Sequence, residues 1–316
     1  MAIADVHETL NGRKFFCSWS GGKDSALSLH RAIQAGGIPA ALLTMMTEGG
    51  ERSRSHGLRL DVLRSQAEAL GLPLITRSAS WSTYEDVFRE TVREFAQQGI
   101  TAGVFGDIDL DEHREWCVRV CREAGLKAEL AGPEGAAGPD DTVEDVRAEA
   151  QDDVRAEAQD GVRAVHPLWK MDRMDVVREF LDAGFQAYIV AMKDGVGRDC
   201  AGTDGGCNEG ADTDGGSNEG ADNDAARNRC AGADALRSNL LALLGRPFDL
   251  HAVNLMVAHG IDACGEVGEF HTVVTGGPLF RRPLDLQFGE PVLRDGYWFV
   301  DAIQSPRAGT GATEVK

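Results

Sequence analysis

The sequence predicts an α/β protein, in which a parallel sheet with helices on both faces is followed by a smaller C-terminal α+β domain. From residue 14 to residue 192, apolar runs typical of buried strands alternate with amphipathic helical stretches. Gly36, Gly71 and Gly99 follow the helical stretches, where a left-handed residue commonly ends a helix. The chain has 316 residues, of which 42% are apolar, so it can bury the core of one large domain or two ordinary ones.

The strands and helices of the first half follow one another directly. Strands are predicted at 14–19, 39–46, 73–78 and 102–108, and helices at 24–35, 58–70, 83–98 and 109–124. A short extended segment, 127–130, comes next. Farther along, the tetrapeptide HPLW at 166–169 leads into a helix over 172–183 and a strand over 185–192. These elements predict a first domain that spans residues 14–193.

The last third of the chain has a different pattern. Two helices are predicted, at 235–244 and 248–259, and three extended runs follow at 270–275, 283–288 and 296–302. This order of elements favours a small second domain over residues 235–304, while the tail beyond it is expected to be disordered.

Two acidic segments interrupt the globular pattern. Residues 131–163 contain DVRAEAQD twice in tandem, and residues 194–234 contain two near-identical copies of a ten-residue unit, TDGGCNEGAD and TDGGSNEGAD. Both segments are poor in large apolar residues, so we expect disordered insertions, with a short helix as the alternative in the first. The acids of the second repeat do not follow the EF-hand spacing, which disfavours a calcium loop. Each segment holds ten acidic and three basic residues, so together they account for most of the net charge of −19.

Composition excludes several classes of protein. The acidic balance argues against broad electrostatic binding of nucleic acid. The N-terminal residues contain no apolar signal region and no window is apolar enough for a membrane span, which predicts a cytoplasmic protein without membrane contact.

Seven cysteines without a CxxC pair do not form a disulfide framework, and Cys117 and Cys121 are expected to be buried small residues rather than metal ligands. No metal site is predicted, and a homo-oligomer is compatible with the sequence.

The strongest chemical motif is SGGKDS, which lies between the first predicted strand and helix. Its glycines allow a sharp turn and close backbone approach, and the amide groups that begin a helix favour an anion. Lysine adds a positive charge and the two serines add hydroxyl donors. The motif predicts a phosphate-binding loop made of Ser20, Gly21, Gly22, Lys23, Asp24 and Ser25.

Three further places carry candidate site residues. Gly106 and Asp107 end the fourth strand, where an acid can hold Mg²⁺ or an ammonium group, although a helix N-cap at Asp107 or Asp109 explains the pattern equally well. Glu266 and Glu269 flank a glycine before a predicted strand, where two carboxylates can bind a cation or act as a base. A hairpin turn with solvated acids is the alternative there. His271 and Thr272 follow directly, and His56 is either a substrate contact or a plain loop histidine.

Taken together, the motifs resemble one family. The segments SGGKDS, HGLRLDVLRSQAEALGLPL, GDIDLDEHREW, HPLW and CGEVGEFHT occur in this order. The combination is similar to the diphthine–ammonia ligases, a branch of the PP-loop ATP pyrophosphatases, over nearly all of the chain outside the two acidic segments. His271, where better-known members often carry Glu, looks like the bacterial branch. The resemblance implies a Rossmann-like (HUP-type) adenine-nucleotide domain with a smaller C-terminal domain.

The resemblance also implies a reaction. The family activates a carboxylate with ATP as an acyl-adenylate, releases pyrophosphate, and lets ammonia displace AMP, so ATP and Mg²⁺ are the implied cofactors. A small-molecule or protein-borne carboxylate and ammonium are the implied partners. By resemblance, the residues that bind the nucleotide are Ser20, Gly21, Gly22, Lys23, Asp24, Ser25, Gly106 and Asp107. The implied catalytic residues are Lys23, Asp24, Asp107, Glu266 and Glu269, and the implied substrate contacts are His56, Glu266, Glu269, His271 and Thr272.

Two other functions compete with amide ligation. A PP-loop enzyme that modifies tRNA is disfavoured by the acidic charge and by the lack of a CxxC pair. A non-catalytic adenine-nucleotide-binding protein would need the same loop but no turnover.

Overall fold

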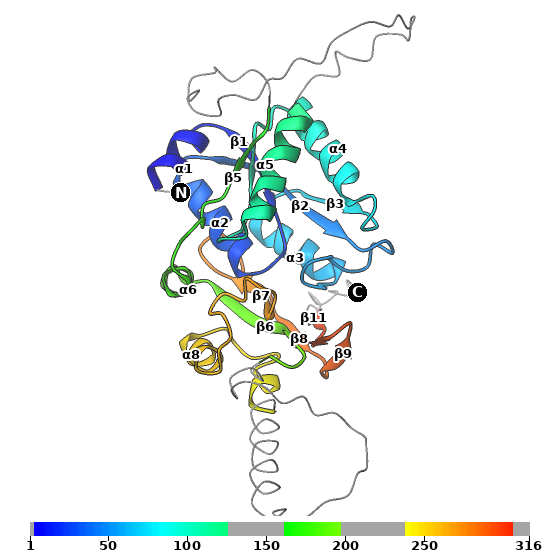
Figure 1. Ribbon diagram of the computed structural model, residues 1–316, viewed down its shortest axis with the longest axis vertical. Coiled ribbons are helices and arrows are strands. Elements are labelled where there is room, and N and C mark those ends of the chain that lie inside the picture. Colours follow the sequence, from blue (N-terminus) through cyan, green and yellow to red (C-terminus); the bar gives the residue numbers. More distant parts are fainter. Residues whose placement is uncertain (1–2, 126–160, 197–237, 306–316) are drawn as a thin grey trace, which may run out of the picture.

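The computed structural model describes residues 3–125, 161–196 and 238–305 (Figure 1). Most of the two acidic segments, the extended run expected at 127–130 and the tail beyond residue 305 lie outside the described residues, so the predictions made for them stay predictions. Within the described parts, none of the helices has the length and apolar character that a membrane span requires.

A five-stranded parallel sheet forms the larger layer of the molecule. Its strands are β1 (Lys14–Ser18), β2 (Ile38–Met46), β3 (Leu74–Ser78), β4 (Ala102–Val104) and β5 (Arg163–Val165). The spatial order is β3-β2-β1-β4-β5, and every neighbouring pair is parallel. The order reverses between β1 and β4, and ligands of open α/β sheets bind at such a switch point, beyond the carboxyl ends of the strands.

Helices cover both faces of this sheet, as the sequence predicted. The helices are α1 (Ile3–Leu10), α2 (Lys23–Gln34), α3 (Leu60–Leu70), α4 (Tyr84–Gln97) and α5 (Asp111–Gly125). In β1, Phe15 and Cys17 pack into a core with residues of α2 and α3, while Phe16 between them packs into a second core with residues of α4 and α5. Alternate side chains of one buried strand therefore serve two cores, which explains why the strand is apolar throughout.

A second, antiparallel sheet lies beside the parallel one (Figure 1). It consists of β7 (Phe270–Gly276), β6 (Gln186–Lys193), β10 (Tyr297–Phe299) and β9 (Val292–Arg294), in this order, while β8 (Leu286–Phe288) pairs with β11 (Ala302–Gln304). The helices α6 (Arg173–Asp182) and α8 (Leu250–Ala258) pack against it. Its apolar residues belong to the same core as α2 and α3, so one continuous core joins the two sheets.

The predicted α/β class is confirmed, and three details differ from expectation. The strand expected at 185–192 is present, but it pairs antiparallel with β7 instead of extending the parallel sheet. The fifth parallel strand, β5, begins at Arg163, which the sequence placed in the first insertion. The helix α1 was not predicted at all. The error at β6 arises because local pattern reveals a strand but not its partner, whereas β5 is only three residues long and too short for a local pattern to reveal it. The expected domain boundaries stay predictions.

Candidate functional site

A cavity of about 590 Å³ opens at the carboxyl ends of β1, β2 and β4 and is closed by the segment 264–272. Six separate stretches of the chain meet there, at 18–25, 43–45, 54–56, 81–84, 105–116 and 264–272. Among the residues singled out from the sequence, those that line the cavity are Ser20, Lys23, Asp24, Ser25, His56, Gly106, Asp107, Glu266, His271 and Thr272. Gly21, Gly22 and Glu269 do not line it.

The SGGKDS loop is held from both sides by hydrogen bonds. The backbone N–H of Lys23 donates to Thr272 Oγ1 at 3.1 Å, and the N–H of Val274 donates to the carbonyl of Gly21 at 2.9 Å. The fully buried Gln66 donates from Nε2 to the carbonyls of Gly21 and Val274 at 2.9 and 2.8 Å. Its Oε1 accepts from the Trp19 indole at 2.9 Å. Gln66 thus joins the loop to β7, a role that sequence reasoning missed.

The glycines at the loop are required by close backbone contact. Gly21 has φ = +83°, a conformation that L side chains rarely adopt. A Cβ on Gly22 would lie 2.6 Å from His56 Nε2 and 3.1 Å from the carbonyl oxygen of Thr272. A Cβ on Gly106 would lie 3.1 Å from the backbone of Asp24. The loop therefore passes between β7 and the end of β4 with no room for side chains at these positions.

Lys23 and Asp24 form a buried ion pair at the start of α2. Lys23 Nζ lies 2.9 Å from Asp24 Oδ2, also donates to the carbonyl of Cys264, and sits 5.3 Å from the centre of the Phe270 ring. Burial acts to lower the pKa of Lys23, but the charge of Asp24 outweighs it and the pKa is raised, so the ammonium stays charged. Burial raises the pKa of Asp24 despite Lys23, and Asp24 Oδ1 is buried without a hydrogen-bond partner.

The serine hydroxyls are tied into the same loop. Ser25 Oγ donates to the carbonyl of Gly22 at 3.0 Å, and Ser20 Oγ donates to Ser25 Oγ at 3.1 Å. The N–H of Gly22 donates to Ser20 Oγ at 3.3 Å. These bonds hold the loop in one shape before any ligand arrives, which lowers the entropy cost of binding an anion.

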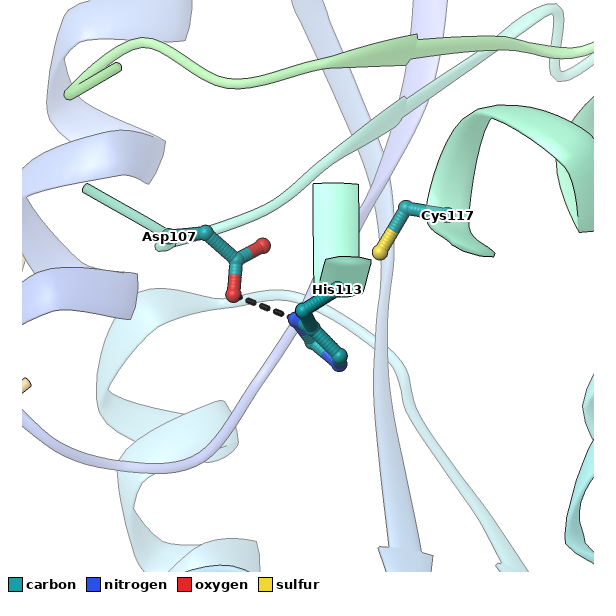
Figure 2. A group of neighbouring side chains, drawn as sticks. All are labelled: Asp107, His113 and Cys117. Atoms are coloured by element: carbon teal, nitrogen blue, oxygen red, sulfur yellow. Dashed lines mark hydrogen bonds and ion pairs between the residues drawn. The ribbon is translucent and has the colours of Figure 1, made fainter. Parts of the chain in front are cut away.

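Asp107 is surrounded by histidines. Asp107 Oδ1 lies 2.5 Å from His113 Nδ1, the contact drawn as a dashed line in Figure 2. Asp107 Oδ2 lies 3.4 Å from His166 Nε2, but the geometry is not that of a hydrogen bond and both atoms lack a partner. Burial acts to raise the pKa of Asp107, yet the two histidines outweigh it and hold the pKa well below its usual range.

The helix-cap alternative for this segment does not describe the structure. The helix α5 begins at Asp111, Asp107 interacts with His113, and Asp109 pairs with Arg173 at 2.7 Å. Sequence reasoning also missed His113 and His166 as neighbours of Asp107. His113 is the third residue of α5, and His166 directly follows β5, so neither lies beside Asp107 in the sequence. Only their presence in the segments GDIDLDEHREW and HPLW pointed to them.

Glu266 is a half-buried acid on the opposite wall. Its Oε1 accepts from the N–H groups of Ile108 and Asp109, at 2.8 and 3.4 Å. Burial raises the pKa of Glu266 to about 7, with the nearby charges of Asp24 and Asp107 acting in the same direction. The prediction of a solvated acid in a hairpin turn does not fit these contacts. Glu269 lies behind the cavity wall, where its Oε1 accepts from the N–H of Asp262 at 3.4 Å and its Oε2 is buried without a partner.

Two neutral histidines cover the loop. The rings of His56 and His271 lie 4.5 Å apart. Burial, followed by the charge of Lys23, lowers the pKa of His271 to about 4. Burial, His271 and Lys23 lower the pKa of His56 well below its usual value. His56 is therefore part of the cavity wall rather than a plain loop histidine.

Much of the remaining cavity wall is apolar or aromatic. The end of β2 contributes Leu43, Thr44 and Met45, and the aromatic residues are Trp19, Trp81, Tyr84, Phe105, Trp116 and Phe270. The Arg54 guanidinium lies 4.4 Å from the centre of the exposed Trp81 ring at this wall. The sequence offered no signal for this surface, because its residues come from separate strands and helices.

Comparisons with known proteins agree with this architecture. Residues 13–128 match the model of the diphthamide synthase N-terminal domain, and residues 234–303 match that of the diphthamide synthase C-terminal domain. No curated protein matches the sequence. One similar solved structure is the U34-tRNA thiolase NcsA from Methanococcus maripaludis with its [4Fe-4S] cluster, at 15% identity and a TM-score of 0.30.

That likeness covers 57% of this chain and 62% of the thiolase, less than two thirds of its length, so it carries no argument about function. The two domain matches, in contrast, together span more than half of the chain. The first covers strands β1 to β4 of the parallel sheet, and the second covers β7, β9 and β10 of the antiparallel sheet. The chain therefore belongs to the diphthamide synthase family.

Proposed function

We propose that the protein is an ATP-dependent, AMP-forming amide ligase that joins a carboxylate to ammonia. One observation carries the proposal: a single cavity places the preformed SGGKDS loop, with its buried and charged Lys23, opposite Glu266, whose pKa is about 7. The loop suits an anionic leaving group, and the acid suits a proton transfer near neutral pH. Membership of the diphthamide synthase family supports the same chemistry.

The cavity fits a nucleotide bound with its phosphates on the loop. Ser20, Ser25 and the N-terminus of α2 line the cavity, and Leu43 and Met45 at the end of β2 offer an apolar surface for a planar base. Asp24 Oδ1, buried without a partner, fits Mg²⁺, which prefers oxygen ligands. Bound there, Mg²⁺ would neutralise charge that develops on the phosphate oxygens.

Each of these cavity residues would have a different role in the reaction. Lys23 and the positive N-terminal end of α2 would bind the β- and γ-phosphates and stabilise them as pyrophosphate leaves, once a carboxylate oxygen of the substrate bonds to the α-phosphorus. Glu266 would accept a proton from ammonium, or from the amine as it attacks the acyl carbon and AMP departs. His56 and His271, both neutral, would line the acyl side without adding positive charge that repels ammonium.

The test is a product assay with α-labelled ATP, ammonium and a panel of carboxylic acids. We expect AMP and pyrophosphate in equal amounts, and only when both the acid and ammonium are present. Exchange of labelled pyrophosphate into ATP should need the acid but not ammonium, because adenylation comes first. Formation of ADP alone, or no turnover with any acid, would refute the ligase. AMP formation that requires tRNA would favour the tRNA-modifying alternative instead.

A further inference from the structure

The wall of the cavity at Asp107 contains a mixed group of metal-type ligands. Atoms of Asp107, His113 and Cys117 that can bind a metal all lie within 4.8 Å of one another. Figure 2 shows the three side chains gathered between the end of β4 and the helix α5. We propose that this group binds one divalent transition metal, with Zn²⁺ as the best match and His166 as the fourth ligand.

The placement of the ligands is a consequence of the fold. His113 and Cys117 are four residues apart on α5, which puts them on one face of the helix. Asp107 follows β4 and turns toward that face, where it already contacts His113. His166 directly follows β5, the neighbour of β4, and so reaches Asp107 from the other side. Two strand ends and one helix face thus meet around Asp107.

Buried atoms without partners point to a missing ligand. His166 is only 2% exposed, and its Nε2 has no hydrogen-bond partner although it lies 3.4 Å from Asp107 Oδ2. Asp107 Oδ2 is buried and unpartnered as well. Leaving two such atoms unsatisfied is costly in a protein interior, and an ion bound by both would remove the cost.

The donor set selects the kind of metal. One carboxylate oxygen, two imidazole nitrogens and one thiol sulfur are typical of a tetrahedral zinc site, whereas Mg²⁺ prefers oxygen and retains water. The site is therefore distinct from the Mg²⁺ position proposed at Asp24. On binding, the ion forms a bond to Cys117 Sγ and the thiol proton leaves to solvent. The ion also takes the place of the proton that His113 and Asp107 share in their hydrogen bond.

Cobalt(II) provides a direct test, because it replaces zinc and is coloured. The full-length protein is stripped of metal with a chelator and titrated with Co²⁺ in the absence of ATP. We expect one equivalent to bind, with visible bands of tetrahedral cobalt, a thiolate-to-cobalt band in the near ultraviolet, and loss of both when Zn²⁺ is added. Cys117→Ser should remove the thiolate band. Cys121→Ser is the matched control and should keep it, since Cys121 is equally buried one turn farther along α5.

A second variant keeps the test valid if Cys117→Ser fails to fold. Loss of a residue that only supports a metal ligand lowers metal affinity by about 10- to 100-fold. His166→Gln, which removes a ligand itself, should weaken Co²⁺ binding by at least this factor, while circular dichroism shows a folded protein. Absence of stoichiometric Co²⁺ binding to the wild type would overturn the proposal. A thiolate band that survives in folded Cys117→Ser would also overturn it, because it would place the metal on another cysteine of the chain.

Discussion

The two walls of the cavity each present a carboxyl group, and these two groups have opposite acidities. Asp107, on the wall formed by β4 and α5, has a side chain only 14% exposed, yet its pKa is lowered because two histidines face it. Glu266, on the wall that precedes β7, has its pKa raised to about 7 because burial is opposed only by two backbone amides. The comparison teaches that the neighbours of a carboxyl group, not its depth of burial, decide its charge here.

The largest expected effect concerns Glu266, the carboxyl group with the raised pKa. Glu266→Gln keeps an oxygen that can accept from the N–H of Ile108 but removes the proton acceptor. We expect amide formation to fall by about 10²- to 10⁴-fold, the range of general base catalysis, while pyrophosphate exchange into ATP continues. Glu112→Gln, at an exposed position of α5, is the control and should behave as wild type. Equal loss of both half-reactions would show that Glu266 acts in nucleotide binding instead.

The next largest effect concerns Lys23, which lies between the two walls. Lys23→Met preserves most of the side-chain volume but removes the charge paired with Asp24. We expect turnover to fall by about 10²- to 10³-fold, as for loss of one preorganised donor to a transition state. Pyrophosphate exchange should fall together with amide formation, unlike in Glu266→Gln. Lys14→Met, at the exposed start of β1, serves as control, and a Lys23→Met protein with normal exchange would contradict the role of Lys23.

The pH dependence of the rate should report the raised pKa of Glu266. A carboxyl group with a raised pKa gains its basic form only as the pH rises through that value, so kcat should rise by about tenfold per pH unit below about 7 and then level off. Glu266→Gln should lose this acidic limb. A limb near pH 4 to 5, or the same limb in the variant, would show that another group controls the rate.

The smallest expected effect concerns the connection between the loop and β7. Gln66→Leu removes the partner that the buried Gln66 gives to the Trp19 indole and to the carbonyl of Val274, while the carbonyl of Gly21 keeps its bond from the N–H of Val274. Each unsatisfied group costs about 1–3 kcal/mol, so we expect urea unfolding at a clearly lower midpoint. ATP affinity should fall with it, since the loop loses its anchor. Gln97→Leu, at an exposed position of α4, should leave the midpoint nearly unchanged.

The local architecture of the loop could be predicted from sequence because its causes are local. An apolar strand, two glycines, a lysine and an immediate helix start occur within a few residues, and the structure shows β1, the tight turn at Gly21 and α2 in those places. The alternation of strands and helices likewise predicted the parallel sheet.

Partnerships between distant residues could not be predicted in this way. The strand β6 has the apolar pattern of a buried strand, and the pattern alone does not distinguish a parallel neighbour from the antiparallel β7. The contact of Gln66 with Val274 and the grouping of Cys117 with Asp107 each depend on how elements pack. Cys117 illustrates the limit well, since its sequence context predicted only a small buried residue.

By itself, the sequence determined the α/β class, the strand–turn–helix of the SGGKDS loop and several of the polar residues that line the cavity, because periodicity, glycine placement and motif spacing are properties of short segments. Only the tertiary structure decided which carboxyl group has a lowered pKa and which a raised one, and which histidines and cysteine surround Asp107. The physical reason is that desolvation and electrostatic interaction depend on distances between residues brought together by folding, and no local pattern encodes those distances.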